Sequence, residues 1–179
     1  MKKYLRTRRS GKLIIKHFGS LDINTGEDVG TGLRTNQQGV WTLAYGCKLV
    51  DTLTGVYLAG KQDKRLATVM YSEQLNLTPK EADKMLSRAL TEAEMIIRTR
   101  IKRELPQHQF DALASFVFDF GYQKNIFHWV DTNDIEKLEP AWLAYGTRTK
   151  DNTRTLPLLQ QRRRVELYLY KTKFVKFRV

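Results

Sequence analysis

Cysteine and histidine are scarce in this sequence of 179 residues. Cys47 is the only cysteine, so an intrachain disulfide and a cysteine metal cluster are both excluded. Nothing near Cys47 in the sequence offers it a histidine partner, so we interpret it as a half-buried structural thiol. The three histidines are scattered and do not form a helical metal-binding pair; they are His17, His108 and His128. We therefore predict neither a metal site nor a cofactor.

Long apolar runs are also missing. The basic N-terminus resembles the start of an export signal, but its only apolar run is Leu13 to Ile15. Such a run is too short for the core of a signal peptide, and a membrane span needs about 20 apolar residues. We therefore expect a chain that is made in the cytoplasm, without a signal peptide or a membrane span.

Acidic residues are too few to balance the basic ones. The sequence has 19 Asp and Glu against 31 Lys and Arg, a formal net charge of +12. A surface of this charge attracts polyanions such as nucleic acid, anionic lipid headgroups or the anionic polymers of bacterial walls. Charge alone does not choose among these partners, and a merely solubilising surface is a further interpretation.

Apolar residues recur with the period of amphipathic helices over much of the sequence. Residues 12–18 predict a short helix that ends at Gly19. A longer helix is predicted from Thr78, because a threonine cap followed by Pro79 and Glu81 forms a capping box. Further helices are predicted over 105–121, 131–145 and 156–170.

The first half of the sequence carries turn formers and β-type residues. Residues 24–39 are rich in glycine and polar residues, which predicts an exposed loop. The runs "VWTLAYG" over 40–46 and "TGVYLAG" over 54–60 are β-branched and aromatic, and the turn candidate "DTLTG" precedes the second run. This pattern predicts an antiparallel hairpin or a small sheet.

Four motifs occur in a fixed order from about residue 12 to residue 171. They read "IIKHFGSL", "NQQGVWTLAYGC", "LPQHQFDALASFVFDFG" and "TLPLLQQRRRVELYL". They resemble the motifs L-I-x-x-F-E-G-L, G-x-W-T-I-G-Y-G-H, L-x-x-x-Q-F-D-A-L-x-S-F-x-F-N-x-G and L-P-G-L-x-x-R-R-x-x-E. These belong to the phage-type lysozymes, the endolysin or muramidase family that cleaves bacterial peptidoglycan. The sequence is identified as a divergent member of that family.

The resemblance implies one lysozyme-like domain over residues 1–179. The fold class would be α+β and mainly helical, with two lobes and a cleft between them. Residues 12–77 would form a small β-hairpin lobe with insertions, 78–104 a long connecting helix and 105–170 the helical lobe. A basic N-terminal arm over 1–11 and a C-terminal extension over 171–179 would flank this domain.

The resemblance also locates three catalytic positions. Glycoside hydrolysis needs a donor that protonates the departing oxygen, and usually a second group that orients or deprotonates water. The family donor is the glutamate of F-E-G, and Gly19 stands at its position. The family aspartate or cysteine aligns with Asn36, which can hydrogen-bond water but cannot take its proton at neutral pH. Only the family threonine is retained, as Thr42. Loss of a general acid alone lowers the rate by about 10²–10⁴-fold.

A relocated acid is the alternative to lost activity. The segment between Ile23 and Asn36 is several residues longer than in the family, and it carries Glu27 and Asp28. A general acid needs the raised pKa that an apolar pocket gives, and a glycine-flanked solvent loop is a poor place to obtain one. Solvated loop carboxylates are the simpler interpretation of Glu27 and Asp28.

Three functions follow from these observations. The first is a catalytically inactive lysozyme-like protein, reused in a phage particle as a structural or peptidoglycan-docking component beside other phage structural proteins. The second is an active peptidoglycan-hydrolysing lysozyme with a relocated acid. The third is a basic nucleic-acid-binding protein on a lysozyme scaffold, with the basic termini as the binding surface.

The basic C-terminal region supplies the candidate binding residues. They are Arg162, Arg163 and Arg164, although the first two match the family's final helix and could instead pack or pair with neighbouring carboxylates. The last residues, "YKTKFVKFRV" over 170–179, could form a short cationic strand that adds to a neighbour's sheet edge. A frayed polar tail is the other interpretation of this segment.

Overall fold

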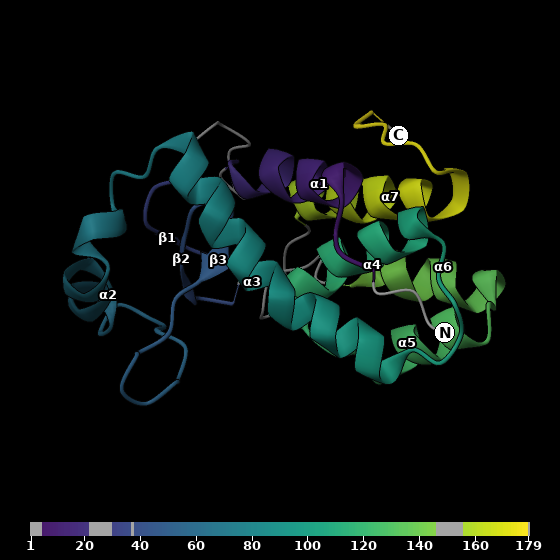
Figure 1. Cartoon of the computed structure of the whole chain (residues 1–179), viewed down its shortest axis with the longest axis horizontal. Coiled ribbons are helices and arrows are strands. Elements are labelled where there is room, and N and C mark those ends of the chain that lie inside the picture. Colours follow the sequence, from purple (N-terminus) through teal and green to yellow (C-terminus); the bar gives the residue numbers. More distant parts are fainter. Residues whose placement is uncertain (1–4, 22–29, 37, 146–155, 179) are drawn as a thin grey trace.

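The computed structural model describes residues 5–21, 30–36, 38–145 and 156–178. The chain folds into a small lobe and a helical lobe, and one long helix crosses between them (Figure 1). The helices are α1 (Arg9–Gly19), α2 (Lys64–Met70), η1 (Ser72–Gln74), α3 (Pro79–Arg100), α4 (Gln107–Phe120), α5 (Lys124–Asp131), α6 (Ile135–Ala144) and α7 (Pro157–Thr172). The strands are β1 (Arg34–Thr35), β2 (Trp41–Leu43) and β3 (Cys47–Lys48). The predicted mainly helical α+β class is confirmed.

The small lobe holds one antiparallel sheet in the order β1-β2-β3. Arg34 pairs with Thr42 across the first ladder, and Leu43 pairs with Cys47 across the second. The prediction of a strand over 54–60 is wrong, because this run makes only isolated bridges, at Val50–Tyr57 and Val40–Ala59. Turn side chains compete there for backbone N–H groups: Asp51 accepts from Leu53 and Thr54 accepts from Val56.

The long helix α3 begins as its sequence predicts. The Thr78 hydroxyl accepts the N–H of Glu81, and the Glu81 carboxylate accepts the N–H of Thr78 at 2.9 Å. The helix ends at Arg100, earlier than the predicted residue 104. Asp131 accepts the next free amides, those of Lys102 and Arg103, and fixes the chain as it turns toward α4.

The helical lobe is built around α4, which packs against α1, α3 and α7. Eight consecutive residues of α4, from Phe110 to Val117, are buried. Phe116 contacts the ring of Trp142 on α6, and Trp142 in turn contacts Tyr170 on α7. Burial of an aromatic or aliphatic side chain of this size stabilises the fold by about 1.5–3 kcal/mol. This core fixes the helices that form one side of the cleft.

The N-terminal segment is folded from residue 5, so the prediction of a basic arm over residues 1–11 is wrong for residues 5–11. Helix α1 begins at Arg9, not at residue 12. The buried Glu94 carboxylate accepts the N–H of Thr7, and Asp111 accepts the N–H of Arg8. Carboxylates at a helix N-terminus satisfy its free amides and stabilise its dipole. Residues 1–4 lie outside the described residues.

The C-terminal extension folds back onto the helical lobe as an irregular segment. The ring of Phe177 lies 4.2 Å from the ring of His17 on α1, and the side chain of Gln161 donates to the carbonyl of Phe177. Val175 also packs against the main core. Over residues 173–178, therefore, the interpretation as a frayed tail is wrong. The described segment forms no strand within this chain, and its addition to a neighbour's sheet edge stays a prediction.

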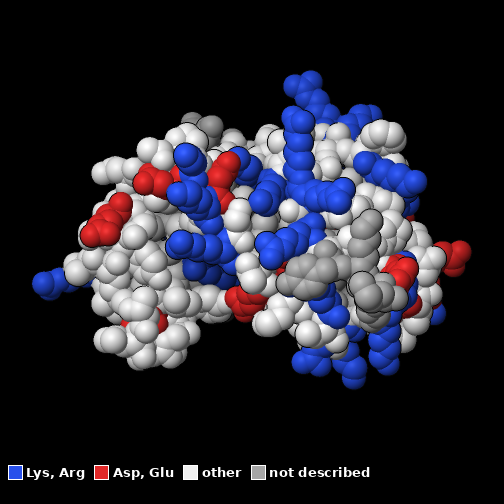
Figure 2. Space-filling model, viewed as in Figure 1, with Lys and Arg blue, Asp and Glu red and all other residues white. Residues whose placement is uncertain are grey.

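Lys and Arg predominate among the charged residues of the face shown in Figure 2. Two lysines of α1 are engaged with α3: Lys16 pairs with Asp83, and Lys12 donates to the Ser87 hydroxyl at 3.0 Å. Within the described residues, no helix is long and apolar enough to cross a bilayer.

Candidate functional site

A cleft of about 200 Å³ opens between the two lobes, and all three positions that the sequence singled out as catalytic lie in its wall. The end of α1 contributes Gly19, β1 and the turn after it contribute Thr35 and Asn36, and β2 contributes Thr42. The helical lobe completes the wall with Asp119, Leu158, Leu159 and Arg162. The three positions that the resemblance implied therefore lie together in one cleft.

Gly19 faces the main chain of the β2–β3 turn. A Cβ atom built on Gly19 would lie 2.6 Å from the carbonyl carbon of Tyr45 and closer still to its carbonyl oxygen. A Cβ atom essentially never lies this close to a main-chain atom to which it is not bonded, so any side chain at residue 19 requires the backbone to move. The turn is tightly folded, since Ala44 and Gly46 both have positive φ, 51° and 90°. Residue 19 thus has neither a carboxylate nor the space for one.

Asn36 stabilises the turn between β1 and β2. Its side-chain oxygen accepts the N–H of Gln38 at 2.9 Å and the N–H of Val40 at 3.0 Å. A side-chain oxygen used in this way mimics a backbone turn. The residue therefore has a structural role in addition to its place in the cleft wall.

Thr42 is almost fully buried, and its hydroxyl donates to the carbonyl of Arg34 at 3.0 Å. This bond ties β2 to β1 beside the paired residues Arg34 and Thr42. Thr42 is thereby engaged in the sheet, with its hydroxyl proton committed to a backbone carbonyl.

Asp119, at the end of α4, is the only carboxylate in the cleft wall among the described residues. Its Oδ2 atom lies 3.0 Å from Arg162 and 2.9 Å from Arg163, both on α7. Two guanidinium groups therefore engage this carboxylate through charge-assisted hydrogen bonds.

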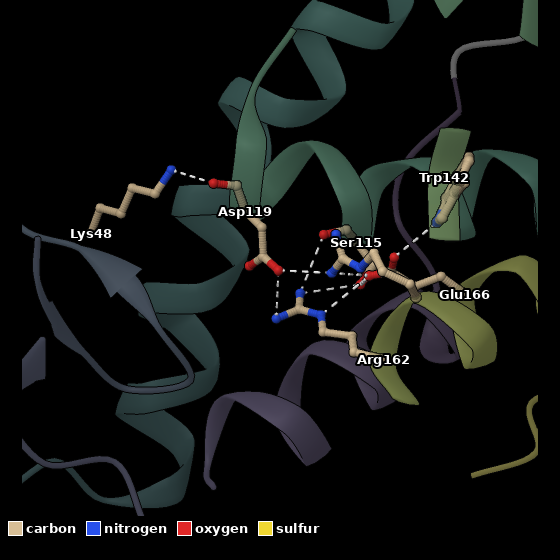
Figure 3. Close-up of polar contacts among 7 residues, drawn as sticks. Lys48, Ser115, Asp119, Trp142, Arg162 and Glu166 are labelled. Atoms are coloured by element: carbon tan, nitrogen blue, oxygen red, sulfur yellow. Dashed lines mark hydrogen bonds and ion pairs between the residues drawn. The ribbon is translucent and has the colours of Figure 1, made fainter. Parts of the chain in front are cut away.

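Behind Asp119 lies a buried polar network, shown in Figure 3. The fully buried Glu166 accepts from Ser115 at 2.6 Å and from Trp142 at 3.1 Å. Both arginines also contact Glu166, at 3.2 Å for Arg162 and 3.0 Å for Arg163. The Arg163 guanidinium packs over the rings of Phe116 and Phe120. Desolvation by burial lowers the pKa of Arg163, and the charges of Glu166 and Asp119 oppose that shift.

Lys48 extends from β3 to the helical lobe (Figure 3). Its Nζ atom donates to the backbone carbonyl of Asp119 at 2.8 Å, so one side chain spans the two sides of the cleft. Burial lowers the pKa of Lys48, and the nearby charges of Asp119 and Glu92 partly offset this effect. Lys48 therefore adds positive charge to the cleft at a fixed position.

The candidate binding arginines differ in exposure. Arg162 and Arg163 are 4% and 0% exposed and pair with carboxylates, so the prediction that they bind a polyanion is wrong. Their alternative interpretation, pairing with neighbouring carboxylates, agrees with the structure. Arg164 is exposed on the opposite side of α7. Glu27 and Asp28, the candidates for a relocated acid, lie outside the described residues.

Cys47 is buried rather than half-buried, and burial raises the pKa of its thiol to about 12. A thiol that stays protonated at neutral pH is a poor nucleophile and a poor metal ligand. The described residues contain no group of three or more His, Cys, Asp or Glu side chains that could hold a metal ion.

Sequence reasoning missed three residues of this site: Tyr45, Lys48 and Asp119. The sequence did single out Asp119 in one respect, because this aspartate stands where the corresponding lysozyme motif has an asparagine. The roles of Tyr45 and Lys48 depend on a main-chain approach and on a contact between residues 71 positions apart, and neither leaves a local pattern in the sequence.

Comparison with known proteins bears on the whole arrangement. The family model described as phage lysozyme matches residues 27–166. The endolysin from Escherichia coli O157:H7 phage FAHEc1 has a TM-score of 0.69 at 18% identity, over 98% of this chain and 99% of that chain. The muramidase domain of SpmX from Asticaccaulis excentricus has a TM-score of 0.65 at 21% identity, over 93% and 98%.

A third solved structure, the active form of P1 phage endolysin Lyz, has a TM-score of 0.60 at 19% identity, over 96% of this chain and 88% of that chain. A search of curated proteins finds no match. At these identities the structural likeness establishes a lysozyme-like fold and leaves the chemistry to the residues of the cleft.

Proposed function

This chain belongs to the phage lysozyme family, and from that premise we propose that it holds peptidoglycan in the family's cleft without hydrolysing it, as a component of a phage particle. The observation that carries the proposal is the contact between Gly19 and the main chain of Tyr45. The proton-donor position has no side chain, and the neighbouring backbone occupies the space that a side chain would need.

The remaining polar groups of the described cleft do not replace the donor. Asp119 is engaged by two guanidinium groups in ion pairs of 3.0 and 2.9 Å. Asn36 cannot accept a proton from water at neutral pH, and the Thr42 hydroxyl is committed to a backbone carbonyl. Without protonation of the departing oxygen, the glycosidic bond is cleaved slower by about 10²–10⁴-fold.

Binding has better support than cleavage. The cleft persists between the lobes, and hydrogen-bonding side chains from β1 and the turn after it remain in its wall. Arg34 and Lys48 border it from the small lobe. Peptidoglycan carries free carboxylates on its stem peptides, and a cationic cleft attracts such groups.

Hydrolysis is tested on the complete chain. Turbidity loss of bacterial walls and zymography are measured for the natural chain and for the double variant Glu27→Gln/Asp28→Asn. We expect no clearing by either protein. Clearing by the natural chain would overturn the proposal, and its loss in the double variant would assign the activity to a relocated acid.

Binding is tested by co-sedimentation with purified wall sacculi. Thr35→Trp places a large ring at an exposed position in the cleft wall, and Gln38→Trp places the same ring at an exposed position outside it. We expect the natural chain and Gln38→Trp to sediment and Thr35→Trp to remain largely in solution. Equal sedimentation of the two variants would show that the cleft does not hold the wall. Mass spectrometry of purified phage particles tests the particle component of the proposal.

A further inference from the structure

A second concavity lies at the far end of α3, where the chain turns and α5 packs beside it. Its volume is about 640 Å³, and it shares no lining residue with the cleft. Its wall carries the basic residues Arg100, Lys102, Arg103 and Lys124 together with Tyr122 and Asp131. We refer to it as the α3–α5 groove. In Figure 2, Lys and Arg gather at the lower right, over the ends of α3 and α5.

Four cations thus face one carboxylate, and that carboxylate is already engaged. Asp131 accepts the backbone N–H groups of Lys102 and Arg103, at 2.7 and 3.0 Å. Arg103 is held in the floor by bonds to Gln109 and to the Tyr170 hydroxyl, both at 2.7 Å. In the part of the chain that the structure describes, the exposed Arg100, Lys102 and Lys124 form no ion pair.

An aromatic ring is fixed among these cations. The Tyr122 side chain is 43% exposed. The Arg100 guanidinium lies 5.0 Å from the centre of its ring, and the Phe127 ring meets it edge-on at 4.9 Å. Two neighbours therefore orient the ring while part of it stays open to solvent. Unpaired cations around an accessible aromatic ring are the combination by which proteins hold single-stranded nucleic acids: the cations follow the phosphates and the ring stacks on a base.

We propose that the α3–α5 groove binds single-stranded nucleic acid, with Arg100, Lys102 and Lys124 on the phosphates and Tyr122 stacked on a base. This proposal is independent of glycan binding in the cleft. The other basic surface, on α1 and the first half of α3, fits this role less well because Lys16 is paired with Asp83 and Lys12 is bonded to Ser87. It also offers no concavity among the described pockets.

The charge component is tested by fluorescence anisotropy of a labelled oligothymidylate of about 12 nucleotides, titrated over a range of salt concentrations. Arg100→Gln/Lys124→Gln removes two charges from the groove. Lys80→Gln/Lys84→Gln removes two exposed charges from the other end of the same helix. We expect the groove variant to bind more weakly and to reduce the magnitude of the slope of log K against log salt by about 1.4, or about 0.7 per phosphate contact. The slope for the control should stay unchanged. An equal loss in both variants, or no binding by the natural chain, would overturn the proposal.

The stacking component is tested at Tyr122 in the same assay. Tyr122→Phe keeps the ring and Tyr122→Ser removes it, and circular dichroism checks that both variants remain folded. We expect Tyr122→Ser to weaken binding by about tenfold and Tyr122→Phe to bind nearly as the natural chain does. Similar affinities for the two variants would overturn the base contact. Poly(glycerol phosphate) has the phosphates without bases, so if it competes as well as the oligonucleotide, the nucleic-acid assignment is wrong and the groove binds wall polymer.

Discussion

Two groups of residues meet at the cleft, and they differ in the bonds that their side chains form. The helical side keeps the arginines and the glutamate of the family's final helix, bonded to one another and to Ser115 and Trp142. The other group, Gly19, Asn36 and Thr42, has no carboxylate and is engaged in backbone contacts. The buried network holds the fold together whether or not the site reacts, because each of its charges is compensated inside the protein. Under the proposed function, the residues that support the fold are therefore separable from those that would catalyse hydrolysis.

Among variants that test this comparison, the largest loss of stability is expected when Glu166 is replaced. In Glu166→Ala the buried Arg162 and Arg163 lose a shared carboxylate, and breaking a buried pair in this way costs about 3–5 kcal/mol. Chemical denaturation measures the free energy of unfolding. Glu139→Ala is the control, because its pair with Lys171 is about 40% exposed on both sides and contributes about 0–1 kcal/mol. Equal losses in the two variants would show that the buried network does not stabilise the fold.

The next effect is expected at Gly19. Helix propensity alone would favour alanine by about 1 kcal/mol, but overpacking costs about 1–3 kcal/mol, and the backbone of Tyr45 cannot rotate away as a side chain could. We therefore expect Gly19→Ala to lower the thermal midpoint clearly. Gly32→Ala is the matched control, since nothing lies within 4 Å of its added methyl group. If Gly19→Glu/Asn36→Asp folded as the natural chain does and cleared bacterial walls, the closed donor position would be disproved.

A smaller effect is expected at Asn36. Asn36→Ala removes the acceptor of two backbone N–H groups and should cost about 1 kcal/mol in denaturant titrations. Asn36→Asp keeps an acceptor oxygen in the same place and should unfold close to the natural midpoint. A loss as large in the aspartate variant as in the alanine variant would mean that the turn does not depend on this oxygen.

The smallest effect is a pH dependence at the C-terminal extension. Burial lowers the pKa of His17, whose ring packs on Phe177. The folded protein then binds fewer protons than the unfolded chain, so stability falls as the pH drops below about 6.5 and through the folded pKa. Thermal unfolding should therefore depend less on pH in His17→Gln than in the natural chain. His128→Gln, at an exposed histidine, is the control. If the thermal midpoint of His17→Gln depends on pH as that of the natural chain does, His17 does not cause the pH dependence.

Local sequence patterns predicted the elements whose causes are local. The capping box at Thr78 and Glu81 marked the start of α3, and apolar periodicity marked α4 and α7. Predictions failed where contacts between residues distant in the sequence determine the structure of a segment. The run over 54–60 has β-type residues, yet it makes only isolated bridges, and side chains accept the N–H groups of Val56 and Ala59. The C-terminal residues looked like a frayed tail because their apolar partners, on α1, are more than 150 residues away in the chain.

The sequence predicts which residue types stand at the candidate site, but not how their side chains and backbone are arranged. The absence of a carboxylate at Gly19 can be read directly from the sequence, and so can the amide at Asn36. The burial of Arg162 and Arg163 cannot, because arginines of the same type are exposed elsewhere on the same helix, as Arg164 is. The approach of Tyr45 to Gly19 depends on how the β2–β3 turn sits against the end of α1, and only the folded chain defines that position.

The contact between Gly19 and Tyr45 also has a consequence for descent within the family. With a glycine at residue 19, the β2–β3 turn lies in the space that a side chain there would need. A change of that one codon to glutamate would meet the backbone of Tyr45, so the variant would be destabilised before it could gain any activity. A carboxylate could be gained at residue 19 only if the turn and the helix end changed together, so a single mutation would not suffice.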